Sequence, residues 1–147
     1  RSTPLYSSAA SDVYKRQIPR FITALLQGNA PKIYGDGEQT RDFTYVGNIV
    51  NANIHALNHA EAPGQIFNIA MGKGSSLNSL VKTLHELTGV TIDADYTDAR
   101  SGDIRHSYAD VSKALNVLQF KSEVSVVDGL QNTIDWYRSL NVNQKPK

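Results

Sequence analysis

Helical stripes alternate with short strand-like segments along most of this chain, and that alternation is typical of the α/β class. Apolar residues recur at helical spacing in four long stretches, residues 18–26, 49–57, 77–87 and 126–140. Between them, short apolar runs predict strands at residues 32–34, 42–46, 65–70 and 91–96. These strands are few and scattered, so they do not make an obviously self-sufficient sheet. The pattern therefore suggests a part of a larger α/β protein.

Capping residues predict where several of these helices begin and end. A Ser, Asn or Asp side chain at a helix start accepts a hydrogen bond from a backbone amide of the first turn. Gly28 and Gly89 are the predicted stops of the helices that precede them. The predicted N-terminal caps are Asn48, Ser75 or Ser76, Asp110 for a short helix through Leu118, and Ser125 with Asp128 as a capping box. The helix after Asn48 is predicted to bury Ile49, Val50, Asn53, Ile54 and Leu57.

Composition and charge exclude several classes of function. The 147 residues suffice for one domain, and 15 basic against 14 acidic residues leave a formal charge of +1. That balance gives no broad attraction to nucleic acid or anionic lipid, and no apolar run approaches the roughly 20 residues that span a bilayer. The absence of Cys excludes disulfides, thiolate metal sites and thiol nucleophiles. We expect a cytoplasmic protein with no nucleic-acid or membrane partner.

Residues 1–17 differ from the rest of the chain. They are rich in Ser and show no apolar period. They resemble translated cloning or adaptor sequence, with a native loop as the alternative. We therefore expect a non-native or disordered leader over residues 1–17 and the structured region over residues 18–147.

Familiar catalytic and metal-binding patterns are missing from the sequence. It has no glycine-rich dinucleotide turn, phosphate-binding lysine loop, nucleophile elbow or zinc-protease motif. The segment Gly72–Ser75 lacks the spacing of a phosphate loop and is predicted to be a turn before a helix. His55 and His59 have the spacing of metal ligands on one helix, but no third ligand lies nearby in the sequence. We expect these two side chains to lie on a solvated face.

Two polar loops remain as candidates for ligand binding. Arg41 lies where a strand begins after the GDG turn, and Arg100, Asp103, Arg105 and His106 gather in a stretch without helical period. Arginine side chains bind phosphate oxygens through two parallel hydrogen bonds, so one Arg from each loop could hold a diphosphate. Asp103 beside them could accept hydrogen bonds from ribose hydroxyls. Arg–Asp pairs that are structural or energetically neutral are the alternative.

The same loops carry a resemblance to a known family. The segments IPRFI, IYGDGEQTRDFTYV, FNIA and SGDIRHSYADVSKA, followed by a closing helix with Trp136 and Tyr137, occur in the order found in extended short-chain dehydrogenase/reductases. Residues 18–147 resemble the C-terminal, nucleotide-sugar-binding half of the NAD-dependent epimerases and dehydratases of that superfamily. GDIRHSYAD is most similar to the UDP-hexose 4-epimerases, and nearest to the UDP-N-acetylglucosamine (UDP-GlcNAc) type.

The resemblance implies which residues would hold a UDP-sugar. Ile33 and Tyr34 would line the uracil pocket, with core packing as the alternative for both. Arg41 and Arg100 would contact the diphosphate, and Asp103 would take a ribose hydroxyl.

Ser107, seven residues after Arg100, would stand beside the hexose. Family members limited to UDP-glucose and UDP-galactose carry a bulky Tyr at this place, whereas those that accept N-acetylated sugars carry a small residue. Because a serine side chain ends at Oγ, it leaves room for an acetamido group. We therefore expect UDP-GlcNAc and UDP-GalNAc as substrates, with UDP-glucose and UDP-galactose as further candidates.

The family reaction oxidises the sugar at C4 with NAD and returns the hydride to the opposite face. It requires a Tyr-x-x-x-Lys pair and a Ser or Thr besides the dinucleotide turn, and no Tyr of this sequence has Lys four positions later. We therefore expect no catalytic residue here. The chain would be an inactive fragment that binds the UDP-sugar, while NAD is bound by the missing N-terminal half. The full-length parent would be a homodimer that supplies polysaccharide precursors.

Three alternatives share part of this pattern. A nucleotide-sugar dehydratase and a UDP-glucuronate decarboxylase have the same scaffold. A non-catalytic nucleotide-sugar binding module would keep Arg41 and Arg100 without a cofactor domain.

One position departs from the family pattern, and one surface lacks a partner. Asn48 stands where the family usually has Asp, and Asn caps a helix equally well. In the family, the helix after Asn48 and the FNIA strand pack on the Rossmann domain. Their apolar faces would be exposed here, so we expect marginal stability or association.

Overall fold

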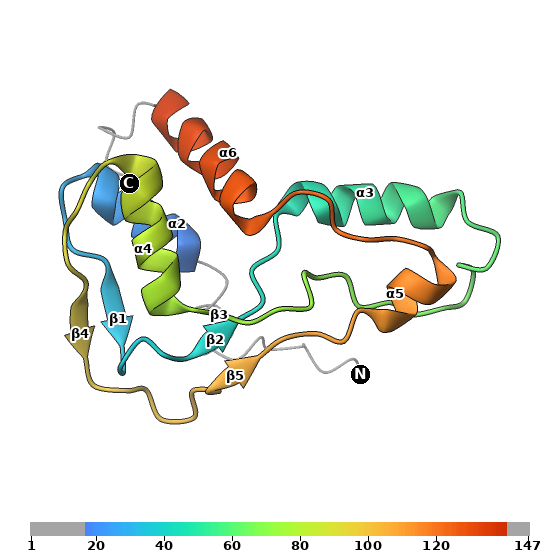
Figure 1. The fold of residues 1–147 in the computed structure, drawn as a ribbon, viewed down its shortest axis with the longest axis horizontal. Helices are drawn as coiled ribbons and strands as arrows, with labels where there is room; N and C mark the ends of the chain where they lie inside the picture. The colour runs from blue at the N-terminus through green and yellow to red at the C-terminus, as the bar shows by residue number, and fades with distance from the viewer. Residues whose placement is uncertain (1–16, 141–147) are drawn as a thin grey trace, which may run out of the picture.

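The computed structural model describes residues 17–140 (Figure 1). Residues 1–16 and 141–147 lie outside that range, and with them all of the predicted leader except Gln17, which is the first residue of a helix. The elements follow one another as α2 (Gln17–Leu26), β1 (Lys32–Tyr34), β2 (Thr40–Arg41), α3 (Val46–Leu57), β3 (Ser75–Ser76), α4 (Leu77–Thr88), β4 (Asp95–Thr97), β5 (His106–Ser107), α5 (Ser112–Val117) and α6 (Val126–Ser139). This alternation confirms the predicted α/β class. No helix within residues 17–140 has both the length and the apolar character needed to cross a membrane.

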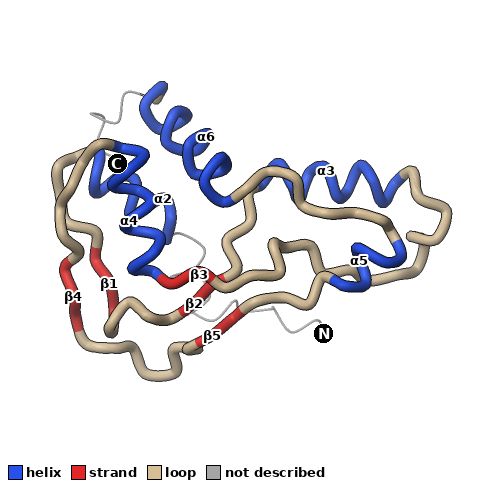
Figure 2. Tube along the Cα trace, in the orientation of Figure 1, coloured by secondary structure: helices blue, strands red, loops and turns tan. Residues whose placement is uncertain are grey.

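Two small sheets join segments that are far apart in the sequence (Figure 2). β1 pairs in parallel with β4, so that Ile33 lies opposite Tyr96. β2 is the middle strand of the second sheet, antiparallel to β3 and parallel to β5. Arg41 therefore lies opposite Ser107, and the GDG loop meets the loop at residues 100–107.

Helices α2, α4 and α6 pack around one hydrophobic core, which β1 closes at one end of the molecule (Figure 1). These helices coincide with three of the four predicted apolar stripes. Fully burying a large aliphatic side chain contributes about 1.5–3 kcal/mol, so this cluster is the main source of stability. The buried members are Phe21, Ile22, Leu25, Ile33, Leu77, Leu80, Val81, Leu84, Leu130 and Ile134.

Several predicted caps are confirmed. Ser76 Oγ accepts a hydrogen bond from the Ser79 amide at the start of α4, and Gly89 ends that helix with a left-handed φ of 74°. Ser125 Oγ accepts from the Asp128 amide at the start of α6. The cap predicted at Asp110 is wrong by one position, because Val111 is the N-cap of α5, although the Asp110 carboxylate still accepts from the Ser112 amide.

The cap predicted at Asn48 is wrong, because α3 begins at Val46 and Asn48 lies inside it. The Asn48 side chain is instead buried, at 1% exposure, against the segment that precedes α6. Its Nδ2 donates to the Val124 carbonyl at 2.9 Å, and its Oδ1 accepts from the Val124 amide at 3.0 Å. The amide thus satisfies both backbone groups of one residue 76 positions away, which no local pattern predicts.

The buried stripe predicted for this helix is also wrong. α3 lies with α5 at the end of the molecule opposite the three-helix core (Figure 1), and its buried residues are Asn48 and Ala52. Val50, Ile54 and Leu57 are 51%, 54% and 85% exposed. Burial requires a neighbouring layer, and residues 17–140 supply one only on the Asn48 side. The expectation that the apolar face of this helix is exposed is confirmed.

Two predicted strands do not form as expected. Pairing at the TRDFTYV segment is limited to Thr40–Arg41, and the chain after it is irregular until α3 begins. The FNIA segment has no regular structure, and Ile66 just before it is 84% exposed. A strand exists only where a neighbour accepts its hydrogen bonds, and these residues have no such neighbour within the described range.

Candidate functional site

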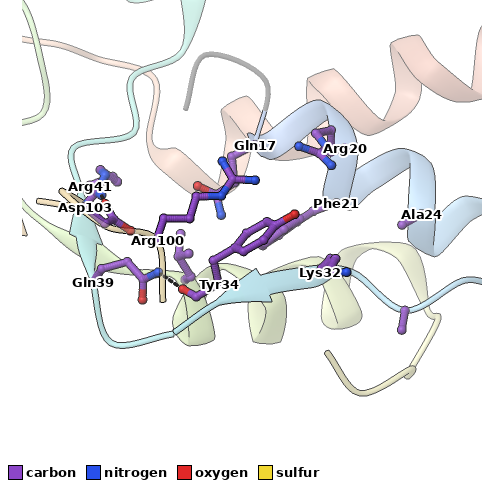
Figure 3. Close-up of a pocket in the computed structure, with 12 residues that line it drawn as sticks. Gln17, Arg20, Phe21, Ala24, Lys32, Tyr34, Gln39, Arg41, Arg100 and Asp103 are labelled. Atoms are coloured by element: carbon purple, nitrogen blue, oxygen red, sulfur yellow. Dashed lines mark hydrogen bonds and ion pairs between the residues drawn. The ribbon is translucent and has the colours of Figure 1, made fainter. Parts of the chain in front are cut away.

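A cavity of about 220 Å³ lies between α2, β1, β2 and the loop at residues 100–107 (Figure 3). It holds four of the six predicted binding residues: Tyr34, Arg41, Arg100 and Asp103. These come from three separate segments, which the pairing of β2 with β5 brings together. The full lining is Gln17, Arg20, Phe21, Ala24, Ala30, Lys32, Tyr34, Gln39, Arg41, Leu77, Arg100 and Asp103.

Arg41 and Asp103 form an ion pair at one end of the cavity. Arg41 Nη2 donates to Asp103 Oδ1 at 2.5 Å, and Arg41 Nη1 donates to the Thr40 carbonyl at 2.7 Å. The two side chains are 14% and 16% exposed, so the pair is well shielded from water. The carboxylate and the carbonyl therefore fix the orientation of the guanidinium.

Arg100 lies over the ring of Tyr34 in the middle of the cavity. Its guanidinium carbon is 3.6 Å from the ring centroid, which is well within the range of a cation–π contact. Arg100 lowers the pKa of the Tyr34 phenol, mainly through a hydrogen bond that favours the phenolate. Burial opposes this effect, and the positive charges of Arg100, Lys32 and Arg20 add to it. The phenol thus lies in a distinctly cationic environment.

The GDG turn positions the two strands that carry these residues. Gly37 has a φ of 78°, and a Cβ there would come within 2.6 Å of Asn78 Cγ. Asn78 at the start of α4 donates to the backbone of the turn and to the Glu38 carboxylate. After the turn, Gln39 Nε2 donates to the Tyr34 carbonyl at 2.6 Å. These contacts hold the end of β1 and the start of β2 against the cavity.

Ile33 and Ser107 are not part of the cavity lining. Successive side chains of a strand point to opposite faces, so β1 directs Tyr34 into the cavity and Ile33 into the core, where Ile33 is fully buried. Only the backbone of Ile33 is therefore available to a ligand. Ser107 is exposed on β5, opposite Arg41 and next to the ion-pair end of the cavity.

Four polar lining residues were not predicted: Gln17, Arg20, Lys32 and Gln39. The same strand alternation would have indicated Lys32, because it shares a face of β1 with Tyr34. Helical spacing similarly relates Gln17 to Phe21 and Arg20 to Ala24 along α2. Gln39 gives no such signal. It is 6% exposed, and its Oε1 has no hydrogen-bond partner among residues 17–140.

The glycine-rich segment at residues 72–75 bends at Gly72 and leads through β3 into α4. The Asp42 carboxylate accepts from the amides of Met71 and Gly72, both at 2.9 Å, so these amides are not available to a phosphate. Asp42 was not predicted, and it ties β2 to this turn. The GDG turn leads into a strand rather than a helix. The described residues therefore do not fit the pyrophosphate of NAD.

The histidine pair on α3 lies away from this cavity. His55 is exposed, its Nε2 is 2.6 Å from the Leu118 carbonyl oxygen, and its ring stacks on that of His59 with 5.8 Å between centroids. Within residues 17–140, no group of three or more His, Asp or Glu side chains is placed to hold a metal ion.

Comparison with known proteins places the chain in one family. The family described as "NAD dependent epimerase/dehydratase family" matches residues 1–70. The UDP-N-acetyl-alpha-D-glucosaminuronate decarboxylase of Bacillus cytotoxicus is 36% identical over 144 residues, which are 92% of this chain and 44% of that protein.

Solved structures show the same arrangement of the chain. The UDP-glucose 4-epimerase of Thermotoga maritima, crystallised with UDP-glucose, superposes with a TM-score of 0.79 at 35% identity, over 84% of this chain and 40% of that one. The UDP-N-acetylglucosamine 4-epimerase of Methanobrevibacter ruminantium, in complex with UDP-N-acetylmuramic acid, gives 0.77 at 37% identity, over 95% and 41%. The chain thus spans less than half the length of these proteins. It belongs to the NAD-dependent epimerase/dehydratase family and matches the C-terminal part of the extended short-chain dehydrogenase/reductase fold.

Proposed function

We propose that this chain is the UDP-sugar-binding part of an NAD-dependent UDP-hexose 4-epimerase. The observation that carries the proposal is the convergence of Arg41, Arg100, Asp103 and the Tyr34 ring on one cavity. Cations for a diphosphate, a carboxylate for hydroxyl groups and an aromatic face for a base are the groups that a sugar nucleotide needs. The names of the epimerases that share this fold support the same assignment.

Each residue has a role in this proposal. Arg41 and Arg100 contact the diphosphate, and Asp103 accepts from a ribose hydroxyl while it holds Arg41. Arg100 leaves the ring face of Tyr34 when a diphosphate offers it a stronger, charged partner. Tyr34 and the backbone of Ile33 then contact the uracil. The described residues hold and orient the substrate, and the chemical step belongs to groups outside them.

Ser107 determines the choice of hexose in this proposal. It lies opposite Arg41 across the β2–β5 pairing, so a sugar attached to the diphosphate can extend past it. Its small, exposed side chain leaves space for an acetamido group. UDP-GlcNAc and UDP-GalNAc are therefore the proposed substrates.

A decarboxylase of UDP-sugar acids is the second candidate. The Bacillus cytotoxicus relative supports it, because that decarboxylase is as similar in sequence as the epimerases are. The two candidates differ in the sugar, which is neutral at C5 in one and carries a carboxylate in the other. Binding selectivity therefore shows whether the sugar is neutral or carries a carboxylate.

Calorimetric titration of the full chain with UDP-GlcNAc, UDP-glucose and UDP-glucuronate tests both candidates. We expect UDP-GlcNAc to bind, and Arg100→Ala to weaken it about tenfold or more, as expected for loss of a charged hydrogen bond. Arg105→Ala is the matched control, because Arg105 lies in the same loop but its guanidinium pairs with the exposed Asp36 carboxylate. Failure of every UDP compound to bind the folded chain would overturn the proposal. Selective binding of UDP-glucuronate would contradict the choice of UDP-GlcNAc and favour a UDP-sugar acid as the substrate.

A further inference from the structure

Two cations of the cavity have no role in the function proposed above. Arg20 on α2 and Lys32 on β1 line the same cavity as Tyr34, and both side chains are exposed. Lys32 Nζ lies 5.8 Å from the centroid of the Tyr34 ring. Figure 3 shows both residues on the side of Tyr34 away from Arg41 and Asp103. Cationic side chains therefore lie at both ends of the cavity, and at one end Arg41 is paired with Asp103.

Neither of these cations is neutralised within the described part of the chain. The ion pairs among residues 17–140 are Arg41–Asp103, Arg105–Asp36 and Arg138–Asp135. Arg20 and Lys32 therefore keep hydrogen-bond donors directed at whatever fills their end of the cavity. Both side chains donate only and cannot accept a hydrogen bond.

Most of the apolar lining lies beside these two cations (Figure 3). Phe21, Ala24 and Ala30 come from α2 and the turn after it, next to Arg20 and Lys32. A planar nucleobase packs on such a wall, whereas a diphosphate does not. With the phosphates at Arg41 and Arg100, the edge of the base faces Arg20 and Lys32.

We propose that Arg20 and Lys32 select the nucleobase, favouring one with a carbonyl oxygen at C4, such as uracil, over cytosine, which has an amino group there. This inference rests on the proposed function, and it assigns base selectivity to two residues with no role so far. Uracil offers these donors an acceptor at C4. Cytosine would instead direct the hydrogens of its amino group at these two cations, neither of which can accept a hydrogen bond.

The test compares UDP with CDP, which carry the same phosphates and ribose, so that the phosphate contribution cancels. Both nucleotides are titrated into the full chain and into the variant Arg20→Gln/Lys32→Met. We expect the original chain to bind UDP about tenfold or more tightly than CDP, and the variant to lose most of that ratio. Because both side chains are exposed, the variant should fold normally, which circular dichroism checks. Lys82→Met, an exposed lysine on α4 outside the cavity, is the control and should leave the ratio unchanged.

Each other outcome contradicts the inference in a different way. Equal binding of UDP and CDP by the original chain would show that the cavity does not distinguish the carbonyl at C4 of uracil from the amino group at C4 of cytosine. An equal loss of UDP and CDP affinity in the variant would show that Arg20 and Lys32 bind phosphate instead. Failure of both nucleotides to bind the original chain would overturn the proposed function and the inference together.

Discussion

Arg41 and Asp103 are 62 residues apart in the sequence and form an ion pair of 2.5 Å whose two side chains are each more than four-fifths buried. The pair connects β2 to the loop at residues 100–107, which also contributes Arg100 to the cavity. The stability of the ion pair and the shape of the cavity are therefore linked. A second pair, Arg105 with Asp36, joins the loop at residues 100–107 to the GDG turn at the surface, where the side chains are 56% and 55% exposed.

Asp103→Ala should destabilise the chain by about 2–4 kcal/mol, because it removes a carboxylate from a largely buried guanidinium. Asp36→Ala is the comparison, since it breaks the exposed pair between Arg105 and Asp36 and should destabilise the chain clearly less than Asp103→Ala does. Urea denaturation of the two variants measures the difference. Equal losses would mean that burial does not strengthen the Arg41–Asp103 pair.

Arg100→Ala should raise the pKa of Tyr34 back toward its ordinary value of 10.0, because Arg100 is the main cause of the lowering. Because the folded-state pKa lies below the unfolded one, Tyr34 contributes stability that is present above about pH 10 and is lost as the pH falls through the lowered pKa. Absorbance of the phenolate during an alkaline titration reports the shift, and subtraction of a Tyr34→Phe titration isolates this tyrosine. An unchanged curve in Arg100→Ala would contradict the contact between the two residues.

Asn48→Asp should destabilise the fold by about 1–3 kcal/mol, because a carboxylate cannot donate to the Val124 carbonyl and is buried beside it. Asn53→Asp is the matched control on the same helix. Asn53 is exposed and its amide bonds only the Ile49 carbonyl, so its replacement should change stability by about 0.5 kcal/mol or less. Thermal or urea unfolding distinguishes the two, and similar losses would show that the Val124 contact contributes little.

Gly37→Ala should be more destabilising than Gly89→Ala. Both residues have a positive φ, 78° and 74°, so each alanine incurs about 1 kcal/mol of backbone strain. A Cβ at Gly89 meets open space, whereas one at Gly37 collides with Asn78 and disturbs the turn between Tyr34 and Arg41. Gly37→Ala should therefore also weaken UDP binding, which calorimetry measures. Equal stability and unchanged binding in both variants would contradict this role of the turn.

The exposed face of α3 should cause the chain to associate at high concentration. Val50, Ile54 and Leu57 form a contiguous apolar surface on one helix. Ile54→Gln/Leu57→Gln should reduce association in sedimentation equilibrium. Ile104→Gln is the control and should not reduce it, because Ile104 is exposed but lies in the loop at residues 100–107, away from α3. A monomeric chain with one sharp, cooperative unfolding transition at all concentrations would contradict the prediction.

Much of the fold could be predicted from the sequence wherever the cause lies within a few residues. The apolar spacing of α2, α4 and α6 identifies the core helices, and Ser76, Ser125 and Gly89 mark helix ends through hydrogen bonds or backbone angles within one turn. The order of short motifs indicated the family. The residue types of the two polar loops likewise predicted three of the cavity residues, Arg41, Arg100 and Asp103, and the family resemblance added Tyr34.

Only the tertiary structure decided which of those residues meet, and how. The Arg41–Asp103 pair depends on the register of β2 with β5, and the Asn48–Val124 contact joins residues 76 positions apart. The exposed stripe of α3 has the same spacing as the buried stripes of the core helices, so its pattern alone did not reveal that no layer covers it. Local spacing fixes the form of a segment because its hydrogen bonds are local. Burial, ion pairing and the shape of a cavity depend on which distant segment packs beside it.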